Sequence, residues 1–459
     1  MHGPARPATG GVIAAALFAG VLAPLNSTMI VVALPEVLTD LGASLTWGSW
    51  IVVSYLVAMA AVQPLGGSLG DRFGRRRLML LGLGGFTIAS TVAAFAPTVE
   101  TLIAARTAQA ITGASTIPNA TALVRTLIPT RAQGRAFGLI GAGIAVAAAI
   151  GPPLGGLITD AFGWRWIFAL NLLALGPAIA LASRIADPGR RSEDGRFDLA
   201  GAVLLLTALV SLALAATIWR VPGMPWPAVA ALALTSVVAT GLLRRHVART
   251  PSPVVDLRLL GRPGFLAAGV SILCSNLTMY TILLALPLFL STLAGWGTRD
   301  IGLLLAGLSV LMLVFGPAGG WLADRFGRRA PALAGTMIAT VGTVPLVAVS
   351  AGWGWSTFLI PLMVVGGGIG LAGAPVQAAA MQAARAGEAG QAAGMFSTMR
   401  YLGSIMGAAS MAAILGADAH EGAFRVLFAL LVLAAVAATA ASSRLPRGLD
   451  AAPQSTPPR

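Results

Sequence analysis

Charged side chains are scarce in this sequence, and lysine is absent. Only 10% of the 459 residues are charged, whereas soluble domains average about 25%. A soluble chain of this length needs far more charge to cover its surface, so the composition excludes a water-soluble protein. Without lysine there is no Gly-x-x-x-x-Gly-Lys-Ser/Thr loop for nucleotide phosphates, which excludes ATP-driven work within this polypeptide.

Cysteine and histidine are also rare. Cys274 is the only cysteine, so the sequence offers no disulfide framework. The histidines His2, His246 and His420 are terminal or lie between apolar runs, and no run holds a cluster of His, Asp or Glu. We therefore expect no metal site, no cofactor and no acid–base centre, and we predict that the protein is not an enzyme.

The basic residues do not form a nucleic-acid surface. The formal net charge is +14, and all 30 basic residues are arginines, gathered in short breaks between apolar runs. They do not form a stripe interleaved with aromatic side chains, which single-stranded nucleic acid would require. We therefore expect a membrane partner and no nucleic-acid partner.

Long apolar runs make up most of the chain. A helix needs roughly 20 apolar residues to cross the hydrocarbon core, where the backbone has to be helical. The sequence predicts fourteen spans, with the least distinct boundary at 220–227, and they lie at about 11–35, 47–69, 77–97, 101–124, 136–159, 165–185, 199–219, 226–243, 264–291, 301–322, 332–351, 356–380, 391–415 and 422–442. The first run ends in Leu34-Pro35-Glu36, so we expect a span there and not a cleaved signal peptide.

The placement of arginine predicts the orientation. With a cytoplasmic N-terminus, the cytoplasmic segments hold 24 arginines, and the outer segments hold only Arg165, Arg220, Arg299 and Arg425. An even number of spans places both termini in the cytoplasm. We predict a multi-pass protein of a bacterial inner (plasma) membrane, surrounded by lipid and monomeric.

An internal repeat divides the chain. The loop Gly66-Gly-Ser-Leu-Gly-Asp71-Arg-Phe-Gly74-Arg-Arg76 recurs as Gly319-Gly-Trp-Leu-Ala-Asp324-Arg-Phe-Gly327-Arg-Arg329, displaced by 253 residues (324 minus 71). The repeat predicts an all-α integral membrane protein with two pseudo-symmetric six-helix bundles, related by an axis along the membrane normal, plus an extra central helix pair. We place the N-terminal bundle at 1–185, a cytoplasmic linker with the extra pair at 186–263, the C-terminal bundle at 264–442 and a disordered cytoplasmic tail at 443–459.

The repeated loop resembles the signature loop of the major facilitator superfamily. Leu25-Asn-Ser-Thr-Met-Ile-Val-Val-Ala-Leu-Pro35, Arg106-Thr-Ala-Gln109-Ala-Ile-Thr-Gly113 and Gly151-Pro152-Pro-Leu-Gly155-Gly156 are similar to signatures of its fourteen-span drug:proton antiporter branch. The resemblance covers nearly the whole chain. It implies a multidrug efflux transporter whose two bundles rock around a central site.

The resemblance also implies a role for each signature. The repeated loop is expected to latch one half to the other, with Asp71 docking near Gly390-Gln391 and Asp324 near Gln133-Gly134; alternatively, it is only a positive-inside loop. The latch residues are Gly67, Asp71, Arg72, Gly74, Arg75, Asp324, Arg325, Gly327 and Arg328. The fifth span is expected to seal the pathway of an exporter, or only to pack closely, through Gly143, Gly151, Pro152, Gly155 and Gly156.

Two arginines within spans have no matching acid. Arg106 and Arg400 lie inside runs, where a charged group has to face a cavity or a partner. None of the 16 acidic residues is deep in a span, and the position of the family's first-span acid holds Asn26. We assign coupling to Arg106, Gln109 and Asn26. Proton coupling then uses Glu36 or Asp40 at the outer mouth, or is absent, and the substrate is anionic or neutral.

The sequence predicts secondary active export of a small molecule, either a drug-like compound or a metabolite, powered by an ion gradient, with protons as a candidate ion. Polar and flexible side chains within the runs are candidates for the substrate cavity, although each can instead bridge helices. They are Asn26, Met29, Tyr55, Asn119, Asn276, Tyr280, Gln377 and Arg400. The alternatives are an uptake carrier or facilitator without proton coupling, and a non-transporting membrane sensor or scaffold.

Overall fold

The computed structural model describes residues 9–185, 198–218, 224–250, 253, 255, 257–383, 389–415 and 420–447, and these residues are helical apart from short turns and connections. The α-helices are α1 (Thr9–Asp40), α2 (Leu45–Phe73), α3 (Arg75–Ala94), α4 (Val99–Ala114), α5 (Thr116–Leu127), α6 (Thr130–Phe162), α7 (Arg165–Ser183), α8 (Leu199–Ile218), α9 (Trp226–Arg249), α10 (Pro263–Thr292), α11 (Thr298–Phe326), α12 (Arg329–Thr343), α13 (Trp355–Gln382), α14 (Ala389–Leu415) and α15 (Glu421–Ser442). Two 3-10 helices, η1 (Leu257–Gly261) and η2 (Pro345–Ala348), precede α10 and follow α12.

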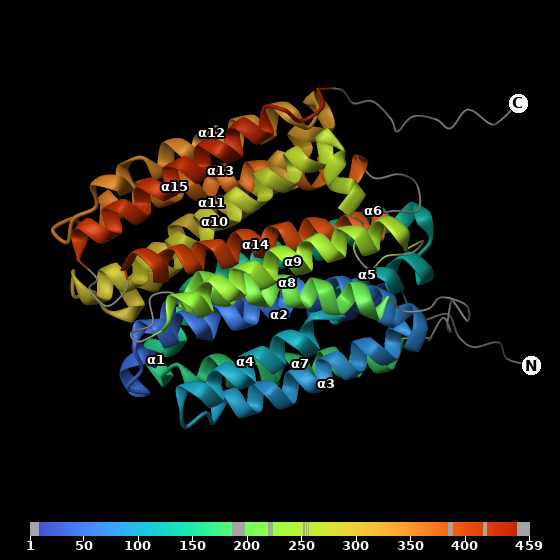
Figure 1. Cartoon of the computed structure of the whole chain (residues 1–459), viewed down its shortest axis with the longest axis horizontal. Helices are drawn as coiled ribbons and strands as arrows, with labels where there is room; N and C mark the ends of the chain where they lie inside the picture. Colours follow the sequence, from blue (N-terminus) through green and yellow to red (C-terminus); the bar gives the residue numbers. More distant parts are fainter. Residues whose placement is uncertain are drawn as a thin grey trace, which may run out of the picture.

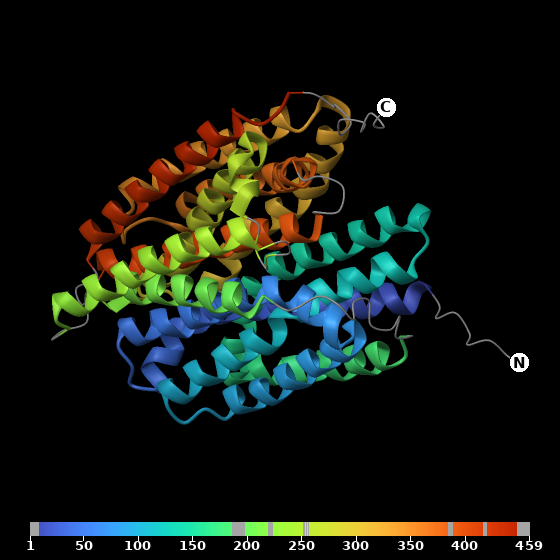
Figure 2. The same cartoon turned by 45° about the vertical axis from the view of Figure 1, so that its right-hand side comes forward.

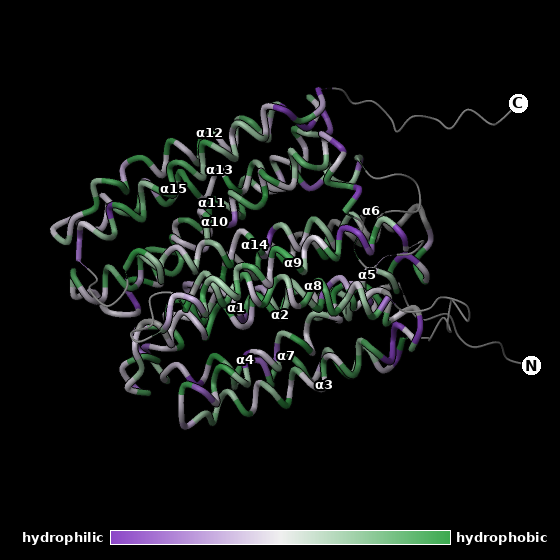
Figure 3. Tube along the Cα trace, viewed as in Figure 1, coloured by the Kyte–Doolittle hydropathy of each residue, from purple (hydrophilic) through white to green (hydrophobic). Residues whose placement is uncertain are grey.

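The long helices run back and forth along one direction, and α1 begins at the end of the bundle where α15 ends (Figure 1). Hydrophilic residues gather towards the two ends of the bundle, and hydrophobic residues fill the length between them (Figure 3). Eleven helices of the described part are long and apolar enough to cross a membrane. The all-α membrane fold predicted from the sequence is therefore confirmed at this level.

The other three predicted spans correspond to α6, to α14, and to α4 followed by α5. The run at 101–124 is not one continuous helix, because α4 ends at Ala114 and α5 begins at Thr116. Pro118 explains the break, since it has no backbone N–H to donate to the preceding turn.

Large apolar side chains cover the outward faces of many helices. On α9, Trp226 is 77% exposed, Val237 is 69% exposed and Leu234 is 63% exposed. A soluble protein rarely exposes so much contiguous apolar surface, whereas a lipid-facing helix requires it. The composition argument and the exposed faces therefore agree on a membrane environment.

The helix bounds repeat with the displacement of the loop sequence. When 253 is added to its residue numbers, α2 has the same first and last residue numbers as α11. After the same addition, both ends of α1 agree with those of α10 to within one residue. The packing partners repeat as well. Helix α1 contacts α6 and α7 as α10 contacts α14 and α15, and α2 contacts α4 as α11 contacts α13.

Contacts between the early and late helices occur at two seams. Helix α2 packs against α14, α6 packs against α11, and α1 meets α10 between them. Helix α8 lies over the first seam, in contact with both α2 and α14, and α9 packs on α8. In Figure 2 the light green α8–α9 pair runs along the boundary between the blue-to-teal helices and the yellow-to-red helices.

The repeated loop makes the same backbone turn in both copies. Gly74 ends α2 with φ of 95°, and Gly327 ends α11 with φ of 80°. Residues with a Cβ rarely adopt such angles, so both positions require glycine. At Gly327 a Cβ would also lie 3.1 Å from the carbonyl oxygen of Arg447.

We expect Gly74→Ala and Gly327→Ala to destabilise the protein by about 1–2 kcal/mol each, because an L-residue is strained at positive φ. Thermal unfolding in detergent measures the effect as a lower midpoint. The matched control is Gly176→Ala in α7, where a Cβ meets nothing within 4 Å and alanine favours the helix. Equal midpoints for all three variants would contradict this explanation.

Candidate substrate and coupling site

Arg106 is the centre of the candidate site. It lies on α4 with 0% exposure, and its Nη1 donates hydrogen bonds to Asn26 Oδ1 on α1 and, at 3.2 Å, to Gln109 Oε1. Gln109 Nε2 donates in turn to Ser90 Oγ on α3 at 2.8 Å. The three predicted coupling residues are thus brought together, and they tie α1, α3 and α4 to one guanidinium group.

Aromatic rings surround the same guanidinium. Its central carbon lies 4.1 Å from the ring centroid of Tyr55 on α2 and 5.9 Å from that of Phe168 on α7. Ring faces attract cations, most strongly where water is excluded. The hydroxyl of Tyr55 donates to the carbonyl oxygen of Ala23 at 3.3 Å, which fixes the ring against α1.

The charge on Arg106 has no acidic partner. Among the described residues, it is the one charged residue in the buried set. Its Nε and Nη2 atoms and the Nδ2 atom of Asn26 are buried without a hydrogen-bond partner. An arginine cannot release its proton to relieve burial, and an isolated charge in low dielectric is strongly unfavourable. The site therefore holds an uncompensated positive charge.

The late helices bring a second arginine and two tyrosines to this region. Tyr280 on α10 is hydrogen-bonded to Ser27 on α1 at 3.3 Å and is within electrostatic range of both Arg106 and Arg400. Arg400 on α14 lies 5.8 Å from the ring centroid of Tyr401 and donates to Ser397 Oγ at 3.3 Å. The Ser27–Tyr280 hydrogen bond therefore links the residue next to Asn26 to a late helix.

The other predicted cavity residues are placed elsewhere or face their own helices. Met29 is fully buried in α1, and Gln377 is exposed on α13. The amide of Asn276 donates to the carbonyl of Ile272 one turn earlier in α10, at 3.0 Å. Asn119 donates to the carbonyl oxygens of Gly66 at 2.8 Å and Ser115 at 2.7 Å, and so joins the α4–α5 break to α2.

The latch predicted for the repeated loop is only partly visible. The structure does not describe the side chain of Asp71 or those of the proposed docking residues, which are Gly390, Gln391, Gln133 and Gly134.

Asp324 is exposed. The arginines of the loop contact their own half. Arg75 donates to Thr126 Oγ1 at 2.9 Å, Arg72 lies over the ring of Phe73, and Arg325 lies over the ring of Trp321. The latch therefore stays a prediction.

Close packing against Asn119 explains Gly70 in the repeated loop. A Cβ at Gly70 would collide with Asn119 Oδ1. We expect Gly70→Ala to lower stability and transport together, because α2 has to move away from the α4–α5 break. The double variant Gly70→Ala/Asn119→Ala should be no less stable than Asn119→Ala alone, since the collision is gone. Additive losses of thermal midpoint in this cycle would contradict the contact.

The fifth-span glycines lie between two neighbouring helices. A Cβ at Gly155 would lie 2.6 Å from the carbonyl oxygen of Met29 on α1, and one at Gly143 or Gly151 would collide with Leu17 or Thr28 of the same helix. Gly156 faces the other way, where a Cβ would lie 2.9 Å from Gly302 Cα and 3.0 Å from the carbonyl oxygen of Thr298 on α11. With Pro152, these residues form a close-packed strip at the α6–α11 seam.

Several residues of the site were not predicted from the sequence. No sequence pattern singled out Gly302 or Ser90, and only the packing of helices distant in sequence reveals them. Phe168 ends the segment Trp164-Arg-Trp-Ile-Phe168, which resembles the antiporter branch, but that pattern gave no sign of its contact with Arg106. Tyr401 directly follows Arg400 in the sequence, so the arginine within the span was the signal that could have pointed to it.

The acids proposed for the outer mouth differ in their partners. Asp40 Oδ2 accepts hydrogen bonds from Arg165 Nη1 at 2.5 Å and from Trp164 Nε1 at 3.1 Å. Glu36 is half-buried one turn earlier in α1. Asp40 is therefore held in an ion pair, which leaves Glu36 as the better candidate for proton exchange.

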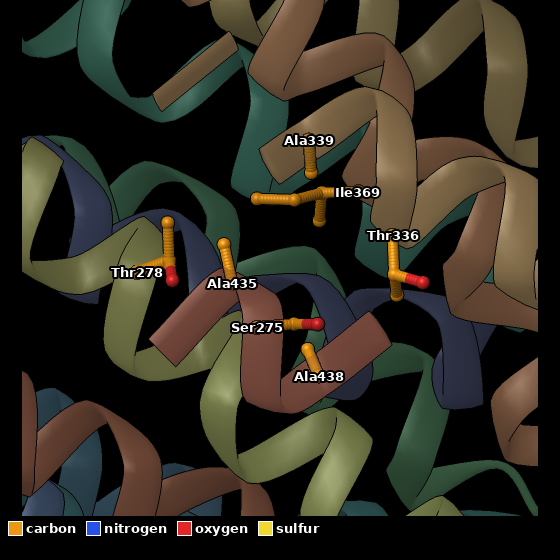
Figure 4. A pocket seen from close by; sticks show the side chains of 7 residues that line it. All are labelled: Ser275, Thr278, Thr336, Ala339, Ile369, Ala435 and Ala438. Carbon is orange, nitrogen blue, oxygen red and sulfur yellow. The ribbon is translucent and has the colours of Figure 1, made fainter. Parts of the chain in front are cut away.

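A separate void lies within the late helices and is lined by small side chains, namely Ser275, Thr278, Thr336, Ala339, Ile369, Ala435 and Ala438 (Figure 4). Its volume is about 210 Å³ even with adjoining open space, which is below the roughly 300–1,000 Å³ of ligand pockets. None of the predicted cavity residues lines it, so it is not the candidate site.

Comparisons with known proteins agree with this description. The profile of the Major Facilitator Superfamily matches residues 16–408. The chain therefore belongs to this superfamily of membrane transporters, and the prediction that it is not an enzyme is confirmed. A crystal structure of a peptide transporter has the same fold, with a TM-score of 0.70 at 14% identity, over 95% of this chain and 96% of that one.

Relatives in the superfamily include named resistance proteins. The chain is 30% identical to multidrug resistance protein Stp of Mycobacterium tuberculosis, over 86% of this chain and 73% of that protein. It is 30% identical to the methylenomycin A resistance protein of Streptomyces coelicolor, over 89% and 86%. It is also 32% identical to the MFS-type transporter YvkA of Bacillus subtilis, over 92% and 93%. These relatives are consistent with the drug-efflux branch of the superfamily.

Proposed function

We propose that this protein is a secondary active transporter that exports a drug-like compound or metabolite by alternating access, powered by an ion gradient. The observation that carries the proposal is the buried Arg106 network. It joins α1, α3 and α4 beside the meeting point of α1 and α10, where a substrate bound between the halves would contact both. A charged side chain buried at this depth is rare in membrane proteins and typically marks a substrate or ion pathway.

The proposed architecture has fourteen spans in two pseudo-symmetric six-helix bundles, with α8 and α9 as the extra central pair and the domain limits 1–185, 186–263, 264–442 and 443–459. The common displacement of 253 residues in loop sequence and helix bounds supports it. Ser27 and Tyr280, which are also 253 positions apart, contact each other. Two residues related by a two-fold axis can touch only at that axis, so this contact supports an axis between α1 and α10.

Export is the proposed direction. The strip of Gly151, Pro152, Gly155 and Gly156 packs α6 against α1 and α11, as expected of a helix that seals the outer side of the pathway. Two of the relatives carry names that describe drug or antibiotic resistance, which export would provide.

The proposed location is a bacterial inner membrane, with both termini in the cytoplasm and a monomeric protein surrounded by lipid. The 24 arginines of the segments on that side support this orientation, since positively charged loops stay on the cytoplasmic side. Two coupling schemes fit the residues. Protons exchange at Glu36, or the cycle uses no proton.

Flux in proteoliposomes tests the function. The purified protein is reconstituted, a pH gradient or a membrane potential is imposed separately, and anionic, neutral and cationic compounds are followed. A transporter accumulates at least one compound under one of the gradients, and heat-inactivated protein does not. Dependence on the pH gradient alone would favour Glu36, which Glu36→Gln then checks.

The second candidate is a non-transporting membrane sensor or scaffold, and the missing acid in α1 favours it. Binding of a compound without flux under either gradient would support this candidate and contradict export. An uptake carrier or facilitator is the remaining alternative. In everted membrane vesicles an exporter accumulates its substrate inside, whereas an uptake carrier releases it. Release of a preloaded compound would therefore identify an uptake carrier.

A further inference from the structure

The charges of the site identify the kind of molecule that completes it. Arg106 and Arg400 contribute two positive groups, and the nearest acid along α1 from Asn26 is Glu36. Ten residues of helix separate these two positions, which corresponds to about 15 Å. Among the described residues, the side-chain hydrogen bonds of Arg106 end on amide oxygens, and none reaches a carboxylate.

The hydrogen-bonding atoms give the same answer independently. Within the hydrogen-bonded pair of Arg106 and Asn26, the buried atoms without a partner are Arg106 Nε, Arg106 Nη2 and Asn26 Nδ2, and all three are donors. The neighbouring acceptors Asn26 Oδ1 and Gln109 Oε1 are already used by Arg106 Nη1. A ligand that fits this inventory supplies acceptors and negative charge, as carboxylate and sulfonate groups do.

The rings around these donors favour a flat apolar body on the ligand. Tyr55 and Tyr280 are buried, and Tyr401 is half-buried beside Arg400. Aromatic side chains provide large contact area, and their faces accept offset stacking by another ring. Since Arg400 and two of the tyrosines come from late helices, a ligand here contacts both halves of the chain.

We propose that Arg106, Arg400 and the three tyrosines bind an aromatic organic anion, and that the membrane potential alone drives its export. This inference rests on the proposed transport function and names its substrate class and energy source. An interior-negative potential favours the outer location of a monoanion about fiftyfold per 100 mV. An exporter of anions therefore needs no proton carrier, which accounts for Asn26 in place of an acid.

Three naphthalene compounds test the proposal, because they share one ring system and differ in charge. They are 2-naphthalenesulfonate, 2-naphthalenesulfonamide and 2-naphthyltrimethylammonium, and neither ion changes its charge with pH. Proteoliposomes receive an interior-positive potassium diffusion potential with valinomycin, which drives anions inward whichever way the protein is oriented. We expect accumulation of the sulfonate approaching fiftyfold at about 100 mV. We expect none under a pH gradient and none of the other two compounds.

Variants assign the effect to the site. Arg106→Gln and Arg400→Gln should each lower the initial rate of sulfonate uptake at least tenfold, whereas the surface variant Arg425→Gln should match the wild type. Arg425 is exposed and paired with Glu421 on the same helix at 3.2 Å, so it controls for loss of an arginine. If Arg106→Gln fails to fold, Asn26→Asp serves instead. Bound sulfonate should raise the thermal midpoint of the wild type. In the Asn26→Asp variant the new carboxylate neutralises Arg106, so sulfonate should leave the midpoint unchanged.

The outcomes separate this inference from the transport function. Accumulation of the ammonium compound but not the sulfonate would overturn the anion site and leave the transporter intact. Sulfonate flux that follows the pH gradient and ignores the potential would overturn the energy source. Absence of flux for all three compounds and for the wider panel would overturn both proposals. Sulfonate accumulation that follows the potential and falls in the arginine variants would establish the inference.

Discussion

Replacing Gly156 with valine should slow transport strongly while leaving a folded protein. The new side chain would enter the α6–α11 seam, where even a Cβ lies 2.9 Å from Gly302 Cα and 3.0 Å from the carbonyl oxygen of Thr298. Overpacking of this kind destabilises the close-packed state by about 1–3 kcal/mol, which changes a conformational equilibrium roughly 5- to 150-fold. Initial rates of flux in proteoliposomes measure the loss.

The partner and a matched control sharpen this prediction. Gly302→Val should have the same effect as Gly156→Val, because each residue meets the other's backbone. Gly241→Val in α9 adds the same side chain where a Cβ meets nothing within 4 Å, and it should transport normally. Wild-type rates in Gly156→Val would show that the seam does not need to close during the cycle.

The second large effect is expected from Asn26→Asp. The new carboxylate would accept the hydrogen bond from Arg106 Nη1 and create a titratable pair inside the membrane. We expect the variant to gain a response to a pH gradient that the wild type lacks, with one coupled proton allowing about tenfold accumulation per pH unit. Uptake of a cationic compound against its gradient provides the measurement.

A control distinguishes the position from the mere presence of a buried acid. Asn171 on α7 is 3% exposed, so Asn171→Asp also introduces a carboxylate into the membrane interior, and it should not gain a response to the pH gradient. If wild-type protein already moves a cation with a pH gradient, the argument from the missing acid is wrong, and a carboxylate such as Glu36 carries the proton.

Much of the fold was predictable because membrane helices are read from length and apolarity. The repeated loop gave the displacement of 253 residues, and the helix bounds follow it closely. The break between α4 and α5 was missed because the run at 101–124 has helical composition throughout. Its cause, Pro118, is visible in the sequence, but hydropathy alone does not register a missing hydrogen bond.

The candidate site was predictable where one residue type was anomalous. Arg106, Arg400 and the absent acid were recognisable because charge within a membrane is unfavourable, and the structure joins Arg106 to Asn26 and Gln109. The assignment of Asn119 and Asn276 to a cavity rested only on polarity. Their amides bond to backbone carbonyls of α2, of the α4–α5 break or of their own helix. Polarity does not reveal the direction of a side chain.

The contacts between helices were beyond sequence reasoning for a physical reason. Gly302 differs from the other glycines of α11 because it packs against the backbone of Gly156 on α6. That contact depends on how α6 and α11 approach each other, which the sequence does not show. The repeat sequence predicts which helices correspond, but it gives no distance across a seam.

Paired distance measurements test alternating access most directly. In a Cys274→Ser background, spin labels at Asp160→Cys and Asp300→Cys report the α6–α11 seam, and labels at Phe73→Cys and Ala393→Cys report the opposite end of the α2–α14 seam. We predict that substrate or an imposed gradient shifts the two distance distributions in opposite directions, one seam opening as the other closes. Distances that stay fixed, or that increase together, would contradict an alternating-access transporter.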